Sequence, residues 1–294
     1  MSARKSTNKL ISTIIVLVLA IVISFVGSKL GLFETESSLP IDDGAFSVHF
    51  IDVGQGDCTL IKTVNGNMLI DAGENGYETT VLNYLEEHGV TELEYFVATH
   101  PHSDHIGGAA EVISGVTVKN VIMPRLSSSN TPATKTYEKM LTAIKQSGAK
   151  AISAKPGSEY RFGDVEFTVL SPFNQDENLN NMSVTLKLTY GSHSFMFTGD
   201  AEKEVEKQLL NKGYDLSADV YKLAHHGSTT SNTVEFFDAV NPEIAVISYG
   251  ADNSYGHPHD EIIEMLEEKN VTYYTTAESG TVIIKADGDK LWVE

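Results

Sequence analysis

The sequence predicts a mixed α/β fold in which β-sheets are covered by helices. Apolar and polar residues alternate with a period of two from Phe46 to Ile51, which is typical of a strand. Turn signals at Asn65-Gly66 and Asp287-Gly288 indicate hairpins and therefore antiparallel strand pairs. Helix-type segments separate the later strands. Because hairpins are too frequent for a purely parallel sheet, we expect mixed sheets with helices packed on them.

The expected elements follow one another closely along the chain. A second strand, Cys58 to Val64, precedes the Asn65-Gly66 turn and a return strand that begins at Met68. A helix with Val81, Leu82 and Leu85 on one face ends at Gly89. We expect further strands at 94–99, 117–123, 165–170, 183–190, 193–198, 219–224 and 243–248, helices at 133–146, 202–210, 232–240 and 260–269, polar loops at 171–181 and 249–259, and two terminal strand pairs.

Length and charge limit the classes of function. A chain of 294 residues with 41% hydrophobic residues can bury a sizeable core. A formal net charge of −19 argues against a surface that holds long nucleic acid by neutralising phosphates. Any nucleic acid would therefore be a substrate that contacts the protein only locally. The single cysteine, Cys58, excludes an intramolecular disulfide and a thiolate metal cluster, and we expect it to be a small buried residue.

The N-terminus predicts a location. Arg4, Lys5 and Lys9 precede an uncharged apolar run at 10–26, which is typical of an export signal or a transmembrane signal anchor. We therefore expect a signal segment at 1–28, a linker at 29–43 and a globular domain at 44–294. The positive flank predicts a single-pass cell-membrane protein with the globular domain extracytoplasmic. An uncleaved anchor is favoured because 26-VGS-28 lacks an A-x-A motif; cleavage would give a secreted form.

Metal-competent residues gather at three predicted strand ends. They are His100, His102, Asp104 and His105 in 99-THPHSDHIGG-108, then Asp200, then His225 and His226. Strand ends of a layered α/β protein lie along one edge, so these residues can converge. Imidazole and carboxylate ligands without sulfur favour zinc, with manganese or iron as alternatives. We therefore predict a metal centre.

The motif His100-Pro-His102-Ser-Asp104-His105 resembles the H-x-H-x-D-H signature of metallo-β-lactamase-fold hydrolases over about residues 44–285. The resemblance implies a four-layer αββα sandwich with two metal ions at one edge of its paired sheets. It also implies the role of each ligand: His100 and His102 bind one ion, Asp104 and His105 the other, Asp200 bridges them, and one of His225 and His226, with His226 favoured, completes the set. Asp71 matches a residue that orients a ligand histidine, or else caps a turn.

A narrower resemblance rests on 49-HFIDVGQGD-57, 180-NNMSV-184, 225-HHGS-228 and 255-YGHPH-259. These segments are similar to the hydrolase domain of competence DNA-uptake (ComEC-type) proteins, without the membrane channel. Where many members of the wider family place another histidine, this chain has Asn180-Asn181. Because an amide oxygen is a weaker zinc ligand than imidazole, operation with one ion stays open.

The supporting roles follow from the same motifs. Asp104, His225 and His257 are the candidate catalytic residues, with His257 contacting a substrate phosphate or protonating a leaving group, unless it is only a loop residue. Asp57, Asn181 and Lys222 are candidates for supporting the site or contacting substrate.

The resemblance implies a metal-dependent hydrolase that uses metal-bound hydroxide, and phosphodiester hydrolysis is the leading interpretation. The expected substrate is a phosphodiester, with short or single-stranded DNA as a candidate; the sequence indicates no protein partner. Two alternatives remain: hydrolysis of a carbonyl substrate such as a β-lactam, lactone or thioester, and a non-catalytic anchored binding module.

Overall fold

The computed structural model describes residues 46–294. The predicted signal segment at 1–28 and the linker at 29–43 lie outside the described residues. Within 46–294, none of the helices combines the length and the apolar character that crossing a bilayer requires.

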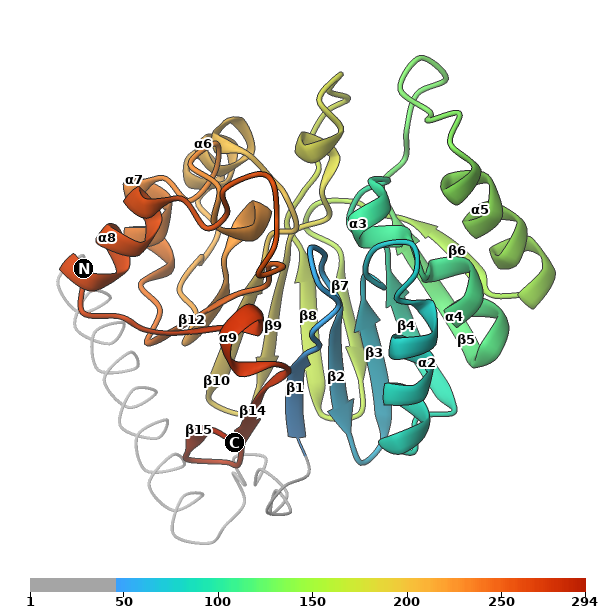
Figure 1. Ribbon diagram of the computed structural model, residues 1–294, viewed down its shortest axis with the longest axis horizontal. Helices are drawn as coiled ribbons and strands as arrows, with labels where there is room; N and C mark the ends of the chain where they lie inside the picture. The colour runs from blue at the N-terminus through green and yellow to red at the C-terminus, as the bar shows by residue number, and fades with distance from the viewer. Residues whose placement is uncertain (1–45) are drawn as a thin grey trace, which may run out of the picture. The chain divides into compact units, whose positions relative to one another are not determined.

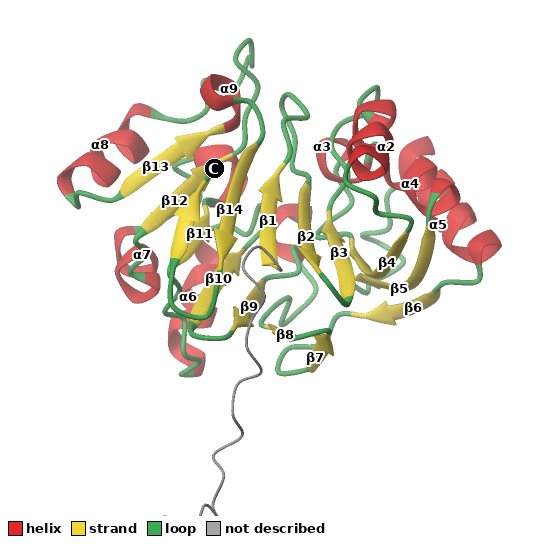
Figure 2. Cartoon of the chain, turned by 90° about the horizontal axis from the view of Figure 1, so that it is seen from below, coloured by secondary structure: helices red, strands yellow, loops and turns green. Residues whose placement is uncertain are grey.

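Two sheets form the centre of the described domain (Figures 1 and 2). The first has the order β15-β14-β1-β2-β3-β4-β5-β6, with bounds Leu291–Val293, Val282–Ala286, Phe46–Phe50, Thr59–Thr63, Gly66–Ile70, Glu92–Val97, Thr117–Met123 and Lys150–Ser153. The second has the order β13-β12-β11-β10-β9-β8-β7, with bounds Thr272–Thr275, Ile244–Ile247, Val220–Lys222, His193–Phe197, Leu186–Tyr190, Val165–Val169 and Glu159–Phe162. Both sheets mix parallel and antiparallel pairs, which confirms the predicted mixed α/β class.

Helices cover the outer face of each sheet, so the layers run helix, sheet, sheet, helix (Figure 2). The helices are α2 Glu78–Glu87, α3 Ser103–Ile106, α4 Ala109–Gly115, α5 Lys135–Ser147, α6 Lys203–Lys212, α7 Val234–Val240, α8 Asp260–Glu268 and α9 Thr276–Ser279, with 3-10 turns η1 Leu179–Met182 and η2 Ala224–Gly227. The inner faces of the sheets meet through aromatic rings: Phe46 of β1 stacks on Tyr190 of β9 with ring centroids 4.2 Å apart. Tyr95 of β4 meets Phe167 of β8 edge to face at 5.1 Å.

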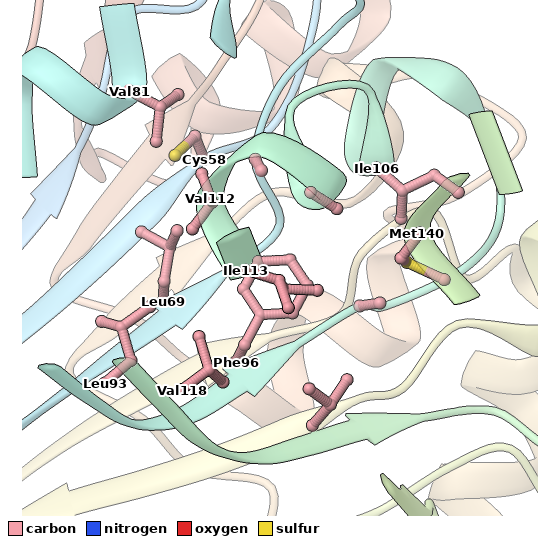
Figure 3. Packing of buried hydrophobic residues seen from close by; sticks show 14 of the residues in the cluster. Cys58, Leu69, Val81, Leu93, Phe96, Ile106, Val112, Ile113, Val118 and Met140 are labelled. Atoms are coloured by element: carbon pink, nitrogen blue, oxygen red, sulfur yellow. The ribbon is translucent and has the colours of Figure 1, made fainter. Parts of the chain in front are cut away.

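The outer core of the first sheet lies under α2, α4 and α5 (Figure 3). Phe96 of β4, Val112 of α4 and Met140 of α5 are almost fully buried there, and Cys58 is packed beside Val81, as expected for a small core residue. Truncating a buried aromatic residue such as Phe96 to alanine removes apolar contacts and leaves a cavity, at a cost of about 3–5 kcal/mol of stability.

Some elements differ from the sequence prediction. The edge strands β6 and β7 and the short helices α3 and α4 were not predicted, because four-residue segments such as 150–153 and 103–106 are too short to show a period. Only one of the two predicted terminal pairs forms: β14 and β15 are antiparallel, whereas β13 joins β12 in parallel in the second sheet. Pairing between segments that are far apart in sequence decided these placements.

The topology brings several strand ends to one edge. β1, β3 and β4 of the first sheet run in the same direction, since β1 and β3 are each antiparallel to β2 and β3 is parallel to β4. In the second sheet β10, β11 and β12 are parallel neighbours. The segments that follow these strands carry the polar residues singled out in the sequence, and α3 lies at this end of the first sheet (Figure 1).

Candidate metal centre

The backbone after β4 changes from extended to helical inside the histidine motif. His102 is extended, with φ −75° and ψ 150°, and α3 begins at the next residue. His100 and His102 therefore project from the segment between β4 and α3, whereas Asp104 and His105 project from a helical turn. Positions 107 and 108, which follow the motif, require glycine because the backbone there passes very close to neighbouring segments. A Cβ on Gly107 would lie 2.1 Å from Asn75 N, and one on Gly108 would lie 2.6 Å from the Ala72 carbonyl oxygen.

We name the first group of converging side chains the four-residue cluster: Asp104, His105, Asp200 and His226. Each offers one ligand atom, and these atoms all lie within 4.8 Å of one another. His105 Nε2 is 3.1 Å from Asp200 Oδ1, and His226 Nε2 is 3.4 Å from Asp104 Oδ2. Asp200 and His226 thus lie within coordinating reach of the 100–105 motif, although they follow it by about 95 and 120 residues in sequence.

The three-residue cluster consists of His100, His102 and Asp200. His100 Nε2 lies 3.0 Å from His102 Nδ1 and 3.6 Å from Asp200 Oδ2. Asp200 therefore turns Oδ1 toward the four-residue cluster and Oδ2 toward the three-residue cluster. A carboxylate shared in this way can bridge two cations.

Asp71 orients His105 from behind. It follows β3 with a positive φ of 59° and is fully buried. Its Oδ2 accepts from His105 Nδ1 at 2.7 Å and from Thr99 Oγ1 at 2.6 Å, while Oδ1 accepts from Thr99 N at 2.8 Å. These bonds fix the ring so that Nε2 faces the cluster, which is the contact the sequence predicted for Asp71.

His226 has a second buried support. Its Nδ1 donates to the Ser248 carbonyl at 2.9 Å and lies 3.4 Å from Asp57 Oδ1. Asp57 in turn pairs with Lys222 Nζ at 2.8 Å, and both side chains are almost fully buried. Neither Asp57 nor Lys222 is among the residues that line the cavity described below, so they act here by holding His226 rather than by facing a ligand.

The turn that carries His225 and His226 is held by residues that sequence reasoning missed. Both histidines have positive φ, 51° and 55°, a conformation that non-glycine residues adopt only when neighbours enforce it. Buried Asn232 supplies this restraint: its Oδ1 accepts from Ala224 N at 3.0 Å, and its Nδ2 donates to the Ala224 and Ser228 carbonyls. Buried Glu206 accepts from Asn232 N. No local motif marks Glu206, because its partner lies 26 residues away.

The charges of the cluster favour a cation. Burial lowers the pKa of His105, but Asp200 and Asp71 outweigh it and hold the pKa well above its ordinary value. The pKa of His226 is raised to about 10, because Asp200 and Asp57 outweigh the effect of burial. Burial raises the pKa of Asp200, yet His105 and His226 hold it well below its usual range. The carboxylates around His105 and His226 thus concentrate negative charge where these two imidazoles meet.

Unpartnered atoms test whether a metal fits. His105 Nε2, Asp200 Oδ1 and His226 Nε2 are buried and make no hydrogen bond to any described residue. Buried polar atoms without partners are rare in native proteins, and these three face one another. A nitrogen and oxygen donor set of this kind suits a divalent ion, often zinc. The residues present therefore fit the predicted metal centre.

A cavity of about 600 Å³ opens beside both clusters. It is lined by Gln55, Asn75, Pro101, His102, Ser103, Asp104, Pro132, Thr134, Thr136, Leu179, Asn180, Asp200, His225, His226, Tyr255 and His257. Asp104, His225 and His257, the candidate catalytic residues, all reach it. Sequence reasoning assigned no role to Tyr255, although it stands in the segment 255-YGHPH-259, and it missed the threonines, which carry no motif of their own.

Asn180, and not Asn181, lines the cavity. Asn181 donates to Asp176 and accepts from the Glu202 backbone N–H, so of its two predicted roles, supporting the site or contacting substrate, its amide is placed for support. The Asn180 Nδ2 donates to Glu202 Oε1 at 2.9 Å, and its buried Oδ1 makes no hydrogen bond to any described residue.

His257 lies close to the metal-ligand candidates. Its ring is stacked against His226 with centroids 6.0 Å apart. Burial and the charges of His226 and His225 lower the pKa of His257 to about 4, so the ring is neutral at pH 7. A neutral ring offers one hydrogen-bond donor and one acceptor, which suits contact with substrate better than delivery of a proton from an imidazolium.

Residues 51–251 match the family described as the Metallo-beta-lactamase superfamily, and the chain belongs to it. The chain is 32% identical over 254 residues to ComE operon protein 3 of Bacillus subtilis, covering 80% of this chain and 32% of that protein. It is 28% identical over 249 residues to competence protein ComA of Neisseria gonorrhoeae, covering 83% of this chain and 33% of that protein. Both predicted resemblances are confirmed.

The chain spans about a third of the length of these curated relatives. Among solved structures, Igni18, a metallo hydrolase from the archaeon Ignicoccus hospitalis, superposes with a TM-score of 0.55 at 16% identity, covering 82% of this chain and 100% of that one. At this identity the likeness concerns the fold alone. The family and the paired clusters identify the chain as a metallo-β-lactamase-superfamily hydrolase with candidate metal-binding residues.

Proposed function

We propose that this chain is an extracytoplasmic, metal-dependent phosphodiesterase of the nuclease type. The observation that carries the proposal is the pair of clusters that share Asp200 beside an open cavity. Two ions placed on either side of one carboxylate suit displacement at phosphorus, where the attacking and the leaving oxygen both need charge stabilisation. The similarity to competence proteins supports a DNA-related substrate.

In this proposal His100, His102 and Asp200 hold one ion, and Asp104, His105, Asp200 and His226 hold the other, with zinc expected and manganese or iron as alternatives. Divalent ions held there would supply Lewis acidity and lower the pKa of bound water to about 7. Asp104 reaches the cavity, and because His105 and His226 outweigh the effect of burial its pKa is lowered to about 2. The carboxylate is therefore ionised at neutral pH and can accept a hydrogen bond from an attacking water.

The remaining residues position the substrate. His225 and His257 line the cavity, where an imidazole can hydrogen-bond to the oxygens of a phosphodiester. Behind the site, Asp71 holds His105 and Asp57 holds His226 in the orientation needed to bind an ion. The net charge of −19 disfavours long duplex DNA, so we propose a short or single-stranded substrate.

Three substrates assayed in parallel test the reaction class: bis-p-nitrophenyl phosphate, single-stranded DNA and nitrocefin, each before and after chelation. We expect the two phosphodiesters to be hydrolysed and the activity to be lost on chelation and restored by metal. Turnover of nitrocefin alone would instead establish the carbonyl alternative. The binding module would be favoured by a different result. The wild type would turn over neither phosphodiester, and folded His102→Ala and Asp200→Ala variants would bind single-stranded DNA as the wild type does.

The location is part of the proposal. Arg4, Lys5 and Lys9 ahead of the uncharged run 10–26 support an anchor whose positive flank stays inside the cell. Protease added to intact spheroplasts should then degrade the domain that begins near residue 44, and the protein should fractionate with membranes. Full protection of the domain would contradict the extracytoplasmic orientation, and recovery in the medium would indicate cleavage.

A further inference from the structure

Tyr255 lies at the edge of the cavity with most of its surface in solvent. Six large hydrophobic side chains are exposed within residues 46–294: Val64, Leu141, Leu210, Val234, Tyr255 and Trp292. Of these only Tyr255, which is 68% exposed, lines the cavity beside the two clusters. Burying an aromatic ring is favourable, so an exposed ring at the opening of a site is a candidate contact for a ligand.

The loop that carries Tyr255 is held by internal hydrogen bonds, although the Tyr255 side chain is exposed. Asn253 fixes the loop from inside: its Oδ1 accepts from Tyr255 N at 3.2 Å and from His257 N at 3.0 Å, and its Nδ2 donates to the carbonyls of Gly250 and His257. Gln55 ties the loop to the segment after β1 by accepting from Gly250 N at 3.0 Å. The ring is therefore presented to the cavity by a backbone that is already organised.

The ring also belongs to a stack that leads to the metal-ligand candidates. Tyr255 is stacked on His257 with centroids 5.6 Å apart and an interplanar angle of 19°. His257 is stacked in turn on His226 at 6.0 Å and 28°. One face of Tyr255 is thus covered by His257, and its large exposed fraction leaves the other face open to a planar ligand group.

The charges of the cavity indicate what kind of group can lie there. Among the lining residues within 46–294 there is no lysine or arginine, and the buried Lys222 is paired with Asp57. Apart from the cluster residues, His225 and His257, the lining side chains carry no charge, including Gln55, Asn75, Thr134 and Thr136. This part of the cavity offers no cation for a second phosphate but does offer hydrogen-bonding groups and one aromatic surface.

We propose that Tyr255 is a stacking platform for an unpaired nucleobase attached to the scissile phosphodiester, and that it sets a preference for nucleotidyl diesters over diesters without a base. The inference rests on the proposed phosphodiesterase function and names the flanking group that this site selects. Stacking on an aromatic ring is tolerant of base identity and requires a base that is free of its partner strand.

The test compares two diesters on the full, metal-loaded 294-residue chain. One is the thymidine dinucleotide d(TpT), and the other is the same sugar-phosphate dinucleotide with both bases removed. The variants are Tyr255→Ala, Tyr255→Phe and Trp292→Ala, the last as a control because Trp292 is an exposed aromatic residue that does not line the cavity. Metal content and circular dichroism are measured for each variant.

We expect Tyr255→Ala to lower kcat/KM for d(TpT) by at least about tenfold, mainly through KM, as the loss of one base stack predicts. Tyr255→Phe keeps the ring and should stay within about twofold of wild type, as should Trp292→Ala. The base-free diester should be cleaved equally by all four proteins.

An equal loss for both diesters in Tyr255→Ala, or no loss for d(TpT), would overturn the platform and leave the phosphodiesterase proposal standing. If the wild type cleaves neither diester under conditions in which it is folded and metal-loaded, both proposals are wrong. The first result is seen only in the variant, and the second already in the wild type, so the two failures are distinguishable.

Discussion

The four-residue cluster and the three-residue cluster share Asp200 but differ in what supports them. In the four-residue cluster, His105 is held by Asp71 at 2.7 Å, and His226 by the Ser248 carbonyl and Asp57. In the three-residue cluster, His100 has Thr99 Oγ1 at 3.2 Å behind it, and His102 is only half-buried. Because outer contacts fix ligand orientation and basicity, the four-residue cluster should bind its ion more tightly.

The electrostatic surroundings differ in the same direction. Buried carboxylates raise the pKa of both His105 and His226, whereas burial and the charge of His105 hold the pKa of His100 well below its ordinary value. The four-residue cluster thus concentrates negative charge that a cation can neutralise. The comparison teaches that two sites built around one carboxylate can differ both in their ligand candidates and in the residues that support them.

The largest effect is expected from Asp200→Ala, because Asp200 is common to both clusters. Calorimetric titration should show both binding events weakened, and activity should fall at least about a hundredfold, since several kcal/mol of transition-state stabilisation depend on the ions. Circular dichroism should confirm that the variant is folded. Retention of one wild-type binding event would show that the clusters do not depend on a shared carboxylate.

A paired comparison separates the clusters. His105→Ala should remove the tighter of two binding events, and His102→Ala the weaker one, because each residue belongs to only one of the two clusters that share Asp200. Elemental analysis after extensive dialysis should then find the tightly held ion in the His102→Ala protein but not in the His105→Ala protein. The opposite result would reverse our ranking of the clusters.

The next effect concerns the residue behind His105. Asp71→Asn keeps the size of the side chain but weakens the bonds that orient His105. We expect a loss of about 10- to 100-fold in the affinity of the tighter event, with the weaker event unchanged. An equal loss in both events would mean that Asp71 supports the fold generally rather than His105 in particular.

The smallest expected effect is a gain at the three-residue cluster. Asn180→His replaces a cavity-lining amide by an imidazole and should raise the zinc affinity of the weaker event about tenfold, since imidazole is the better zinc ligand. Asn181→His is the matched control, because Asn181 does not line the cavity and its amide is bonded to Asp176 and to the Glu202 backbone N–H. A larger gain in the control would show that the loop arranges these two positions differently.

Much of the fold could be predicted locally. The strand Thr117–Met123 has the predicted bounds, and most other strands and helices differ by one to three residues, because period and turn residues act over short distances. The pairing of β14 with β1, more than two hundred residues away, has no local signal. The parallel pairing of β13 with β12 in the second sheet has no local signal either.

The site divides in the same way. The ligand candidates could be predicted because His100, His102, Asp104 and His105 form a dense motif and the other candidates follow apolar strands. The roles of Asn180 and Asn181 could not, since adjacent residues in a 3-10 turn point in different directions. Glu206 was missed because its partner lies 26 residues away, and Asn232 because nothing in its own segment shows that its side chain bonds back to the turn at 224–228.

The sequence by itself determined which chemistry is available: oxygen and nitrogen ligands without sulfur, on strands whose ends carry them. The tertiary structure decided how these groups are shared, with one oxygen of Asp200 facing each cluster and buried Asp71, Asp57 and Lys222 set behind the histidines. Composition fixes what a side chain can donate or accept. Only the packing of the two sheets decides which of those atoms meet, because distances of a few ångströms arise between residues far apart in the chain.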